Sequence, residues 1–280
     1  MGMQDKLVFI GGPPRSGTTL LQRMLNLHPL IYAGPEFDFV PPIIRLRKRM
    51  LASIESGRIS EFLSEDELDE YFKNFLGGIL EGKLLASGKK VICEKSPANA
   101  EVMPDILDLF KDSKGIVILR DPKDVMASLF SVRDRYEAKG KQAPQFTVDA
   151  KSAIIRYSSV LNPTLEALER FPQRVCLVFY EDLVERPKQA ISEVLDFLGL
   201  REIDEVLDLG RDDLLQKRDR SGMWHTQEQL TRSISQASVG KWKHAITNKD
   251  LVELEAAFGE VKLLSRYFSE LDIRQGSDDN

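Results

Sequence analysis

The sequence predicts an α/β fold in which a central parallel sheet is flanked by helices and carries helical insertions. Four short apolar runs are rich in Val and Ile and almost unbroken, as expected for strands covered on both faces: 7–10, 91–93, 116–119 and 175–180. A segment with helical spacing of apolar residues follows each run: 18–27, 102–110, 122–132 and 187–198. Because strands and helices alternate, the predicted sheet is doubly wound.

The rest of the chain is predicted to add helices around this sheet. Segments 147–170 and 248–269 have helical spacing, and Ser64 with Glu67 forms a predicted capping box. No internal repeat or low-complexity linker divides the sequence, so we expect one domain over 1–280. Its parts are a strand and loop (6–37), a helical insertion (38–88), the sheet core (89–200), a polar loop expected to cover a ligand (210–245) and a disordered tail (270–280).

Composition limits the classes of function. The net charge of -5 argues against a general nucleic-acid binder, because phosphate backbones favour an excess of Lys and Arg. No apolar run approaches the roughly 18 residues that span a bilayer. The N-terminus lacks the basic segment and long apolar segment of a signal peptide, so a cytoplasmic location is expected. Cys93 and Cys176 lie in strand-like runs and are predicted to be buried core thiols.

The first strand is followed by the loop GGPPRSGTTLL, residues 11–21. A Walker A loop reads G-x-x-x-x-G-K-[ST], and Gly12 and Gly17 have the matching separation. Thr18 stands where the lysine would be. Because that lysine reaches the β and γ phosphates of a nucleoside triphosphate, the loop is better suited to a single 5′-phosphate. The predicted fold is therefore a P-loop-like three-layer fold, and its loop is predicted to bind a phosphate ester other than a nucleoside triphosphate.

The loop carries several groups suited to an oxyanion. The amides of residues 16–19 can point at one phosphate, aided by the dipole of the following helix. Thr18 and Thr19 add hydroxyl donors, and Arg15 adds a planar cation. A glycine turn capped by Ser and Thr is the purely structural alternative.

Two segments resemble the nucleotide-binding motifs of one enzyme family. PPRSGTTLL resembles the 5′-phosphosulfate loop of sulfotransferases that use 3′-phosphoadenosine 5′-phosphosulfate (PAPS). IVILRDPKDVMASLF resembles the family's 3′-phosphate segment, in which an Arg at a strand end, here Arg120, precedes a Ser, here Ser128. The alternative for Arg120 is a surface ion pair with Asp121 that caps a helix.

The resemblance is closest to the tyrosylprotein sulfotransferase-like branch. The first helix ends at His28-Pro29, and Glu36 in AGPEFDFVP takes the place of that branch's catalytic base. Lys95 in EKSPAN takes the place of its catalytic lysine, the structural alternative being an ion pair with Glu94, and Tyr180 in VFYEDLVERP that of a tyrosine near the nucleotide. The segment 233–243 resembles a late loop that covers PAPS.

The resemblance implies transfer of a sulfuryl group from PAPS by in-line displacement, which leaves 3′-phosphoadenosine 5′-phosphate (PAP) as product, with no metal required. The implied catalytic residues are Glu36 as base, with Lys95 and Arg15 meeting charge at the leaving phosphosulfate. We expect Pro35, Phe37 and Phe39 to bury the base partly. The implied nucleotide-binding residues are Pro14, Arg15, Ser16, Gly17, Thr18, Thr19, Arg120, Ser128, Tyr180, Ser238 and Lys241.

The sequence leaves open the acceptor, the identity of the base and the role of Trp242. Pro35 and Asp38 depart from the branch at positions near the acceptor, so the acceptor is a small molecule, a carbohydrate or a peptide, through a hydroxyl or an amine. His225 is an alternative base, whereas His28 is read as a helix cap. Trp242 either stacks on adenine or lies in the core. The rival functions are a P-loop kinase or nucleotide hydrolase and a non-catalytic nucleotide-binding domain; a homodimer is left open.

Overall fold

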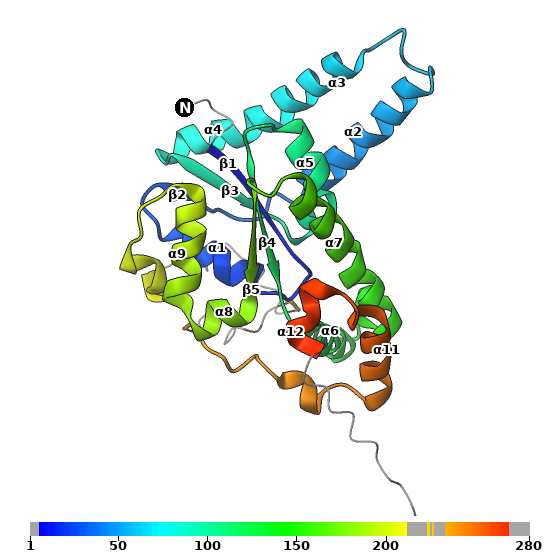
Figure 1. Cartoon of the computed structure of the whole chain (residues 1–280), viewed down its shortest axis with the longest axis vertical. Coiled ribbons are helices and arrows are strands. Elements are labelled where there is room, and N and C mark those ends of the chain that lie inside the picture. Colours follow the sequence, from blue (N-terminus) through cyan, green and yellow to red (C-terminus); the bar gives the residue numbers. More distant parts are fainter. Residues whose placement is uncertain (1–5, 212–222, 225, 227–232, 269–280) are drawn as a thin grey trace, which may run out of the picture. The chain divides into compact units, whose positions relative to one another are not determined.

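The computed structural model describes residues 6–211, 223–224, 226 and 233–268 (Figure 1). Contacts between residues divide the chain into two compact units. The first unit comprises Met1–Arg120 with Arg156–Val239, and the second comprises Asp121–Ile155 with Gly240–Asn280. The whole sheet lies in the first unit, and the single-domain organisation over 1–280 stays a prediction.

A five-stranded parallel sheet forms the centre of the first unit, which confirms the predicted fold class. The strands are β1 (Leu7–Gly11), β2 (Ile31–Tyr32), β3 (Val91–Lys95), β4 (Lys114–Leu119) and β5 (Val175–Phe179), in the order β2-β3-β1-β4-β5. The sequence pattern did not predict β2, because two residues are too few to show a periodicity. Since all strands are parallel, their carboxyl ends meet at one edge, where ligands bind in such sheets.

Helices flank the sheet and form the insertion, as predicted (Figure 1). Those of the first unit are α1 (Thr18–Asn26), α2 (Val40–Glu55), α3 (Glu65–Phe72), α4 (Gly78–Ser87), α5 (Met103–Leu109), α8 (Tyr180–Glu185) and α9 (Pro187–Leu198), and α7 (Ala150–Arg170) contributes to both units. The capping box at Ser64 is confirmed: Ser64 Oγ accepts from the Glu67 amide at 3.3 Å, and the Glu67 carboxylate accepts from the Ser64 amide at 2.9 Å. The π-helical turn η2 (Lys73–Gly77) joins α3 to α4.

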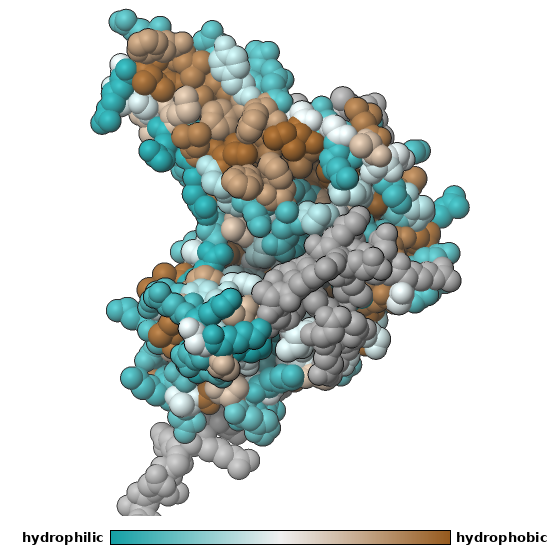
Figure 2. All heavy atoms as spheres, turned by 180° about the vertical axis from the view of Figure 1, so that it is seen from behind, coloured by the Kyte–Doolittle hydropathy of each residue, from teal (hydrophilic) through white to brown (hydrophobic). Residues whose placement is uncertain are grey.

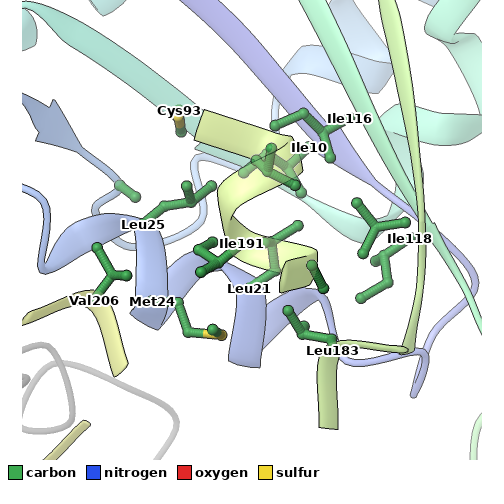
Figure 3. Packing of buried hydrophobic residues seen from close by; sticks show 14 of the residues in the cluster. Ile10, Leu21, Met24, Leu25, Cys93, Ile116, Ile118, Leu183, Ile191 and Val206 are labelled. Atoms are coloured by element: carbon green, nitrogen blue, oxygen red, sulfur yellow. The ribbon is translucent and has the colours of Figure 1, made fainter. Parts of the chain in front are cut away.

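One face of the sheet buries the apolar side of α1 together with α9 (Figure 3). Leu21 and Leu25 of α1 pack with Ile10 of β1, Ile116 of β4 and Ile191 of α9, and all are almost completely buried. These contacts hold the start of α1 against the ends of β1 and β4. The loop between β1 and α1 is therefore built on a rigid support.

The two cysteines differ in their surroundings. Cys93 belongs to this core, and burial raises the pKa of its thiol far above the ordinary range. Cys176 is only partly buried. Burial and, to a smaller extent, the negative charge of Glu193 raise the pKa of its thiol to about 11. Both are free thiols. The prediction of a buried core thiol is confirmed for Cys93, whereas Cys176 packs against the core but is only partly buried.

The second unit is helical. It contains α6 (Pro122–Glu137), α11 (Asn248–Phe258), the 3₁₀ turn η9 (Lys262–Leu264) and α12 (Ser265–Phe268). The predicted single helix over 248–269 is wrong, because Gly259 follows the last residue of α11 and Val261 is extended. An extended residue interrupts the i to i−4 hydrogen bonds that a continuous helix needs. Residue 269 and the tail 270–280 lie outside the described residues.

Exposed apolar side chains gather on the helical insertion (Figure 2). They are Phe39, Leu46, Phe62, Tyr71, Phe75, Ile79 and Leu85. Within the described part of the chain, every helix is too short or too polar to cross a bilayer.

Candidate functional site

The loop between β1 and α1 has the backbone geometry of an anion cradle. Arg15 and Gly17 both take left-handed conformations, with φ of 75° and 92°, and the Ser16 amide donates to the Pro13 carbonyl at 3.1 Å. Gly17 precedes the first residue of α1 and gives the helix no side-chain cap. The first amides of a helix lack intrahelical partners, and the helix dipole favours negative charge there. The loop therefore presents donors to an anion rather than capping itself.

Close packing explains why residue 17 is glycine. A Cβ atom on Gly17 would lie 2.4 Å from Cδ2 of Tyr180, well inside van der Waals contact. Tyr180 starts α8 directly after β5 and is 8% exposed. The predicted nucleotide residue Tyr180 thus packs against the loop itself.

Ser16 is the clearest sign that the loop is built for a ligand. The residue is completely buried, and its Oγ has no hydrogen-bond partner within the described part of the chain. Buried hydroxyls in folded proteins are almost always paired, because an unpaired one costs about 1–3 kcal/mol. A phosphate or sulfate oxygen would satisfy this donor together with the first amides of α1.

Arg120 connects three of the predicted binding segments. It follows β4 and is 5% exposed. One guanidinium nitrogen donates to the Arg15 carbonyl at 3.0 Å and the other donates to the Ser238 carbonyl, while the guanidinium lies 4.6 Å from the ring centre of Tyr180. Arg120 is therefore a buried side chain of the first unit and not a surface one.

Lys95 and Glu36 form an ion pair at the carboxyl end of β3. The Lys95 side chain is 1% exposed and its Nζ donates to a Glu36 carboxylate oxygen. The alternative partner, Glu94, is the preceding strand residue, and successive strand side chains point to opposite faces. The structure therefore joins the two predicted catalytic residues.

Glu36 is partly enclosed, with its side chain 38% exposed, but Pro35 and Phe39 stay exposed to solvent themselves. Phe37 and Phe39 instead contact each other, with ring centres 5.8 Å apart. The left-handed backbone of Asp38 precedes Phe39, the N-cap residue of α2, whose side chain is 62% exposed.

The sequence was compared with known protein families. The model of the sulfotransferase family matches residues 8–205, which include the loop, Lys95, Arg120 and Tyr180. This chain belongs to the sulfotransferase family.

Its relatives in sequence are distant. A putative protein-tyrosine sulfotransferase of Caenorhabditis briggsae is 26% identical over 204 residues, covering 72% of this chain and 69% of that protein. Protein-tyrosine sulfotransferase A of Caenorhabditis elegans is 24% identical and covers 89% of this chain and 64% of its own length. The chain thus spans about two thirds of the length of these curated relatives.

Solved sulfotransferases share the fold. The sulfotransferase domain of the curacin biosynthetic pathway has a TM-score of 0.61 at 21% identity, covering 90% of this chain and 96% of that domain. Mouse sulfotransferase SULT7A1, solved in complex with PAP, has a TM-score of 0.58 at 17% identity. The match covers 95% of this chain and 88% of the mouse chain. At this identity the likeness establishes the fold.

In this sulfotransferase-family chain, Asp38 adds a second carboxylate beside Glu36. Asp38 is left-handed, with φ of 61°, and its amide donates to Ser96 Oγ at 3.1 Å. Loss of solvent around its carboxyl group raises the pKa of Asp38, as do the charge of Glu36 and a hydrogen bond to it, while Lys95 and Ser96 oppose this shift. Asp is among the few side chains that tolerate a left-handed backbone, at a cost of about 1–2 kcal/mol.

The predicted residues Ser128 and Lys241 lie in the second unit. Asp124 on α6 accepts from the Gly240 amide at 2.8 Å and from the Trp242 amide at 3.0 Å, so it holds both sides of Lys241. Ser128 lies one turn further along α6, on the same face as Asp124. Because Arg120 belongs to the first unit and Ser128 to the second, their convergence on one phosphate stays a prediction.

The structure shows the role of His28 but leaves the predicted roles of Trp242 and His225 as predictions. Trp242 is partly buried, with Lys123 Nζ 5.0 Å from its ring centre, and stacking on adenine stays a prediction. His28 is structural: its Nδ1 accepts from the Leu30 amide and its Nε2 donates to the Arg201 carbonyl. His225 lies outside the described residues, as do 212–222 and 227–232 of the predicted covering loop 210–245.

Sequence reasoning missed the residues that hold the acidic loop 36–38. Glu94, Ser96 and Asn99 are buried and hydrogen-bonded to one another and to that loop. A signal was available, because a glutamate inside the apolar strand VICEK needs buried partners. The pattern alone does not say which partners these are.

Proposed function

We propose that the chain transfers a sulfuryl group from PAPS to a hydroxyl or amine of an acceptor. The observation that carries the proposal is the position of Arg120. Its guanidinium contacts the carbonyl of the 5′-phosphosulfate loop at Arg15 and the carbonyl of Ser238 in the predicted covering segment. A nucleotide with its 5′-phosphate in the loop and its 3′-phosphate beside the covering segment would have this one guanidinium next to both groups.

Support for the donor comes from the loop and from the fold. The buried Ser16 hydroxyl and the uncapped start of α1 suit one phosphosulfate. Thr18 takes the place of the Walker lysine, which would reach a γ-phosphate. A structural neighbour, mouse SULT7A1, is solved with PAP, which PAPS becomes after transfer.

The proposed step needs a base and cations. As the acceptor oxygen or nitrogen bonds to sulfur, the bond between sulfur and the bridging phosphate oxygen breaks, and the acceptor proton passes to the Glu36 carboxylate. Lys95 and Arg15 meet the negative charge that builds on the leaving phosphate. Because Lys95 Nζ already contacts Glu36, one short network would connect the proton acceptor to the leaving group. No metal is needed in this proposal, since fixed cations supply the charge.

The acceptor site is proposed to lie against the start of the insertion. Phe39 is 62% exposed and is the N-cap residue of α2, three residues after Glu36. An acceptor that reaches Glu36 would therefore meet Phe39 at the start of the insertion, on which further apolar side chains are exposed (Figure 2). This favours an acceptor with an aromatic or aliphatic part and leaves open a small molecule, a carbohydrate or a peptide that carries one. The cytoplasmic location also stays a proposal.

A thermal-shift titration separates this function from the rival nucleotide enzymes. We expect PAP to raise the melting temperature without a metal ion, and ATP with Mg²⁺ to raise it less at the same concentration. Greater stabilisation by ATP with Mg²⁺ would contradict the proposal and favour a kinase or hydrolase. Transfer of labelled sulfate from PAPS to a panel of phenols, aliphatic alcohols, amines and sugars then distinguishes an enzyme from a non-catalytic nucleotide-binding domain.

A further inference from the structure

Glu94 is a buried carboxylate that the proposed chemistry does not use. It lies in β3 next to Lys95 and is 5% exposed. Burial raises the pKa of Glu94, and the hydrogen bonds that it accepts oppose this effect. A carboxylate in such a position is costly unless it is hydrogen-bonded, so its partners show what it is for.

Three donors converge on the two oxygens of Glu94. Ser96 Oγ donates to Oε1 at 2.7 Å, and the Phe37 amide donates to the same oxygen at 3.2 Å. Asn99 Nδ2 donates to Oε2 at 2.6 Å and to the Ile10 carbonyl at 3.1 Å. Ser96 and Asn99 are 1% and 0% exposed, so the network is shielded from water.

Two of these contacts hold the loop that carries Glu36. The Phe37 amide bonds to Glu94, and the Asp38 amide bonds to Ser96 Oγ, which in turn bonds to Glu94. The two amides that follow Glu36 are thus tied to one buried carboxylate. Asp38 keeps its left-handed backbone under this restraint.

The same segment also holds the phosphate loop. The Gly12 amide donates to the Pro97 carbonyl at 3.0 Å, and Asn99 bonds to the last residues of β1 through Ile10. The turn EKSPAN therefore connects the loop of the proposed donor site with the loop of the proposed base. Strand β3 positions Lys95 from the same turn.

We infer that Glu94 is a positioning residue, which with Ser96 holds the backbone of residues 37–38 so that Glu36 meets Lys95. This inference deepens the proposed function and rests on it only for the role of Glu36. The geometric part concerns two backbone amides and is measurable without an acceptor.

The experiment is hydrogen exchange of the peptide covering 34–40, with and without PAP, in wild type and Glu94→Gln. The substitution removes the negative charge and turns one acceptor oxygen into a donor, so the hydrogen bonds from Phe37 and Ser96 are weakened without a change of shape. We expect exchange in 34–40 to be roughly five- to tenfold faster, with affinity for PAP within about twofold of wild type.

A matched control separates positioning from stability. Asp69→Asn weakens the partly buried ion pair between Asp69 and Arg47, which joins α3 to α2. It is expected to lower the melting temperature and to leave exchange in 34–40 unchanged. If Glu94→Gln leaves that exchange unchanged, or raises exchange equally throughout the first unit, the positioning role is refuted.

A second variant keeps the test decisive. If Glu94→Gln is not recovered folded, Ser96→Ala removes the acceptor of the Asp38 amide, and faster exchange in 34–40 supports the inference while unchanged exchange overturns it. Turnover of labelled PAPS separates the two proposals. If Glu94→Gln loosens 34–40 but Glu36→Gln turns over at the wild-type rate, the positioning role stands and Glu36 is not the base.

Discussion

Lys95 and Glu36 lie 59 residues apart in the sequence, and their side chains form an ion pair at the carboxyl end of β3. Lys95 is held on a buried strand, whereas Glu36 sits on a short loop and remains partly exposed. The pair places a buried cation against a proton acceptor that solvent can reach. This arrangement determines what each substitution at the pair should do.

Replacing either member of the pair should reduce turnover much more than nucleotide binding. We expect Glu36→Gln to lower kcat by about 10²- to 10⁴-fold and Lys95→Met by about 10²- to 10³-fold, measured as transfer of labelled sulfate from PAPS. Lys114→Met, at the start of β4, is the control, since Lys114 bonds to the Phe197 carbonyl at the opposite end of the sheet. Unchanged turnover in Glu36→Gln would remove Glu36 as base.

Arg120→Ala should abolish discrimination for the 3′-phosphate. The guanidinium supplies charge-assisted hydrogen bonds, so we expect PAP to lose roughly 10- to 100-fold in affinity while adenosine 5′-phosphate loses much less. Isothermal titration of both nucleotides gives the ratio. Arg174→Ala removes another arginine that holds backbone carbonyls of the first unit and should leave the ratio unchanged. A wild type with equal affinity for both nucleotides would contradict the role.

Gly17→Ala should destabilise the protein through the packing of Tyr180. The added Cβ meets the Tyr180 ring at 2.4 Å, and φ is 92°. We expect the free energy of unfolding to fall by about 2–4 kcal/mol. Gly57→Ala isolates the backbone term, because Gly57 has φ of 76° and a Cβ there meets nothing within 4 Å. That control should cost about 1 kcal/mol; equal losses in urea unfolding would show that the tyrosine contact contributes nothing.

Asp124→Asn should loosen the segment that carries Lys241. The carboxylate accepts from the amides of Gly240 and Trp242 with one oxygen each, and Asn keeps only one acceptor. We expect roughly fivefold faster hydrogen exchange in 238–243 and weaker binding of PAP. Asp134→Asn, a surface residue of α6 paired with Arg133, is the control and should change neither.

Asp38 should make the protein less stable as the pH rises through the acidic range. Its folded-state pKa is raised, so the native state holds the proton to a higher pH than the unfolded state does. The free energy of unfolding therefore falls as the pH rises from the ordinary Asp pKa through the raised one. Asp38→Asn should flatten this part of the stability curve and gain stability relative to wild type near neutral pH.

An oppositely shifted carboxylate provides the control for that pH dependence. Hydrogen bonds from Ser152 lower the pKa of Asp149, so its contribution is present above the ordinary Asp pKa and is lost as the pH falls. Asp149→Asn should therefore lose stability near neutral pH. Urea unfolding between pH about 4 and about 7 measures both variants. If both variants change the free energy of unfolding in the same direction, the pKa of Asp38 is not raised in the folded protein.

Much of the fold was predictable because it rests on local patterns. The unbroken apolar runs of β1, β3, β4 and β5 and the helical spacing after each of them predicted a parallel sheet, which is confirmed. The helix at 187–198 has the predicted bounds, since Pro187 starts it and Gly199 ends it. Strand β2 and the break after Phe258 were missed, because neither a two-residue strand nor a single extended residue changes a periodicity.

The sequence by itself determined the residue types and the order of the site. Gly17, the Thr at position 18, Arg120 and Lys95 each follow a strand or end one, and parallel strands bring such positions to one edge. Only the tertiary structure decided the partners: Lys95 with Glu36 rather than Glu94, Tyr180 on Gly17, and Glu94 on the amides of residues 37–38. The reason is physical. Local spacing sets which face a side chain takes, but hydrogen bonds and packing between distant segments depend on the strand order and on the path of the loops.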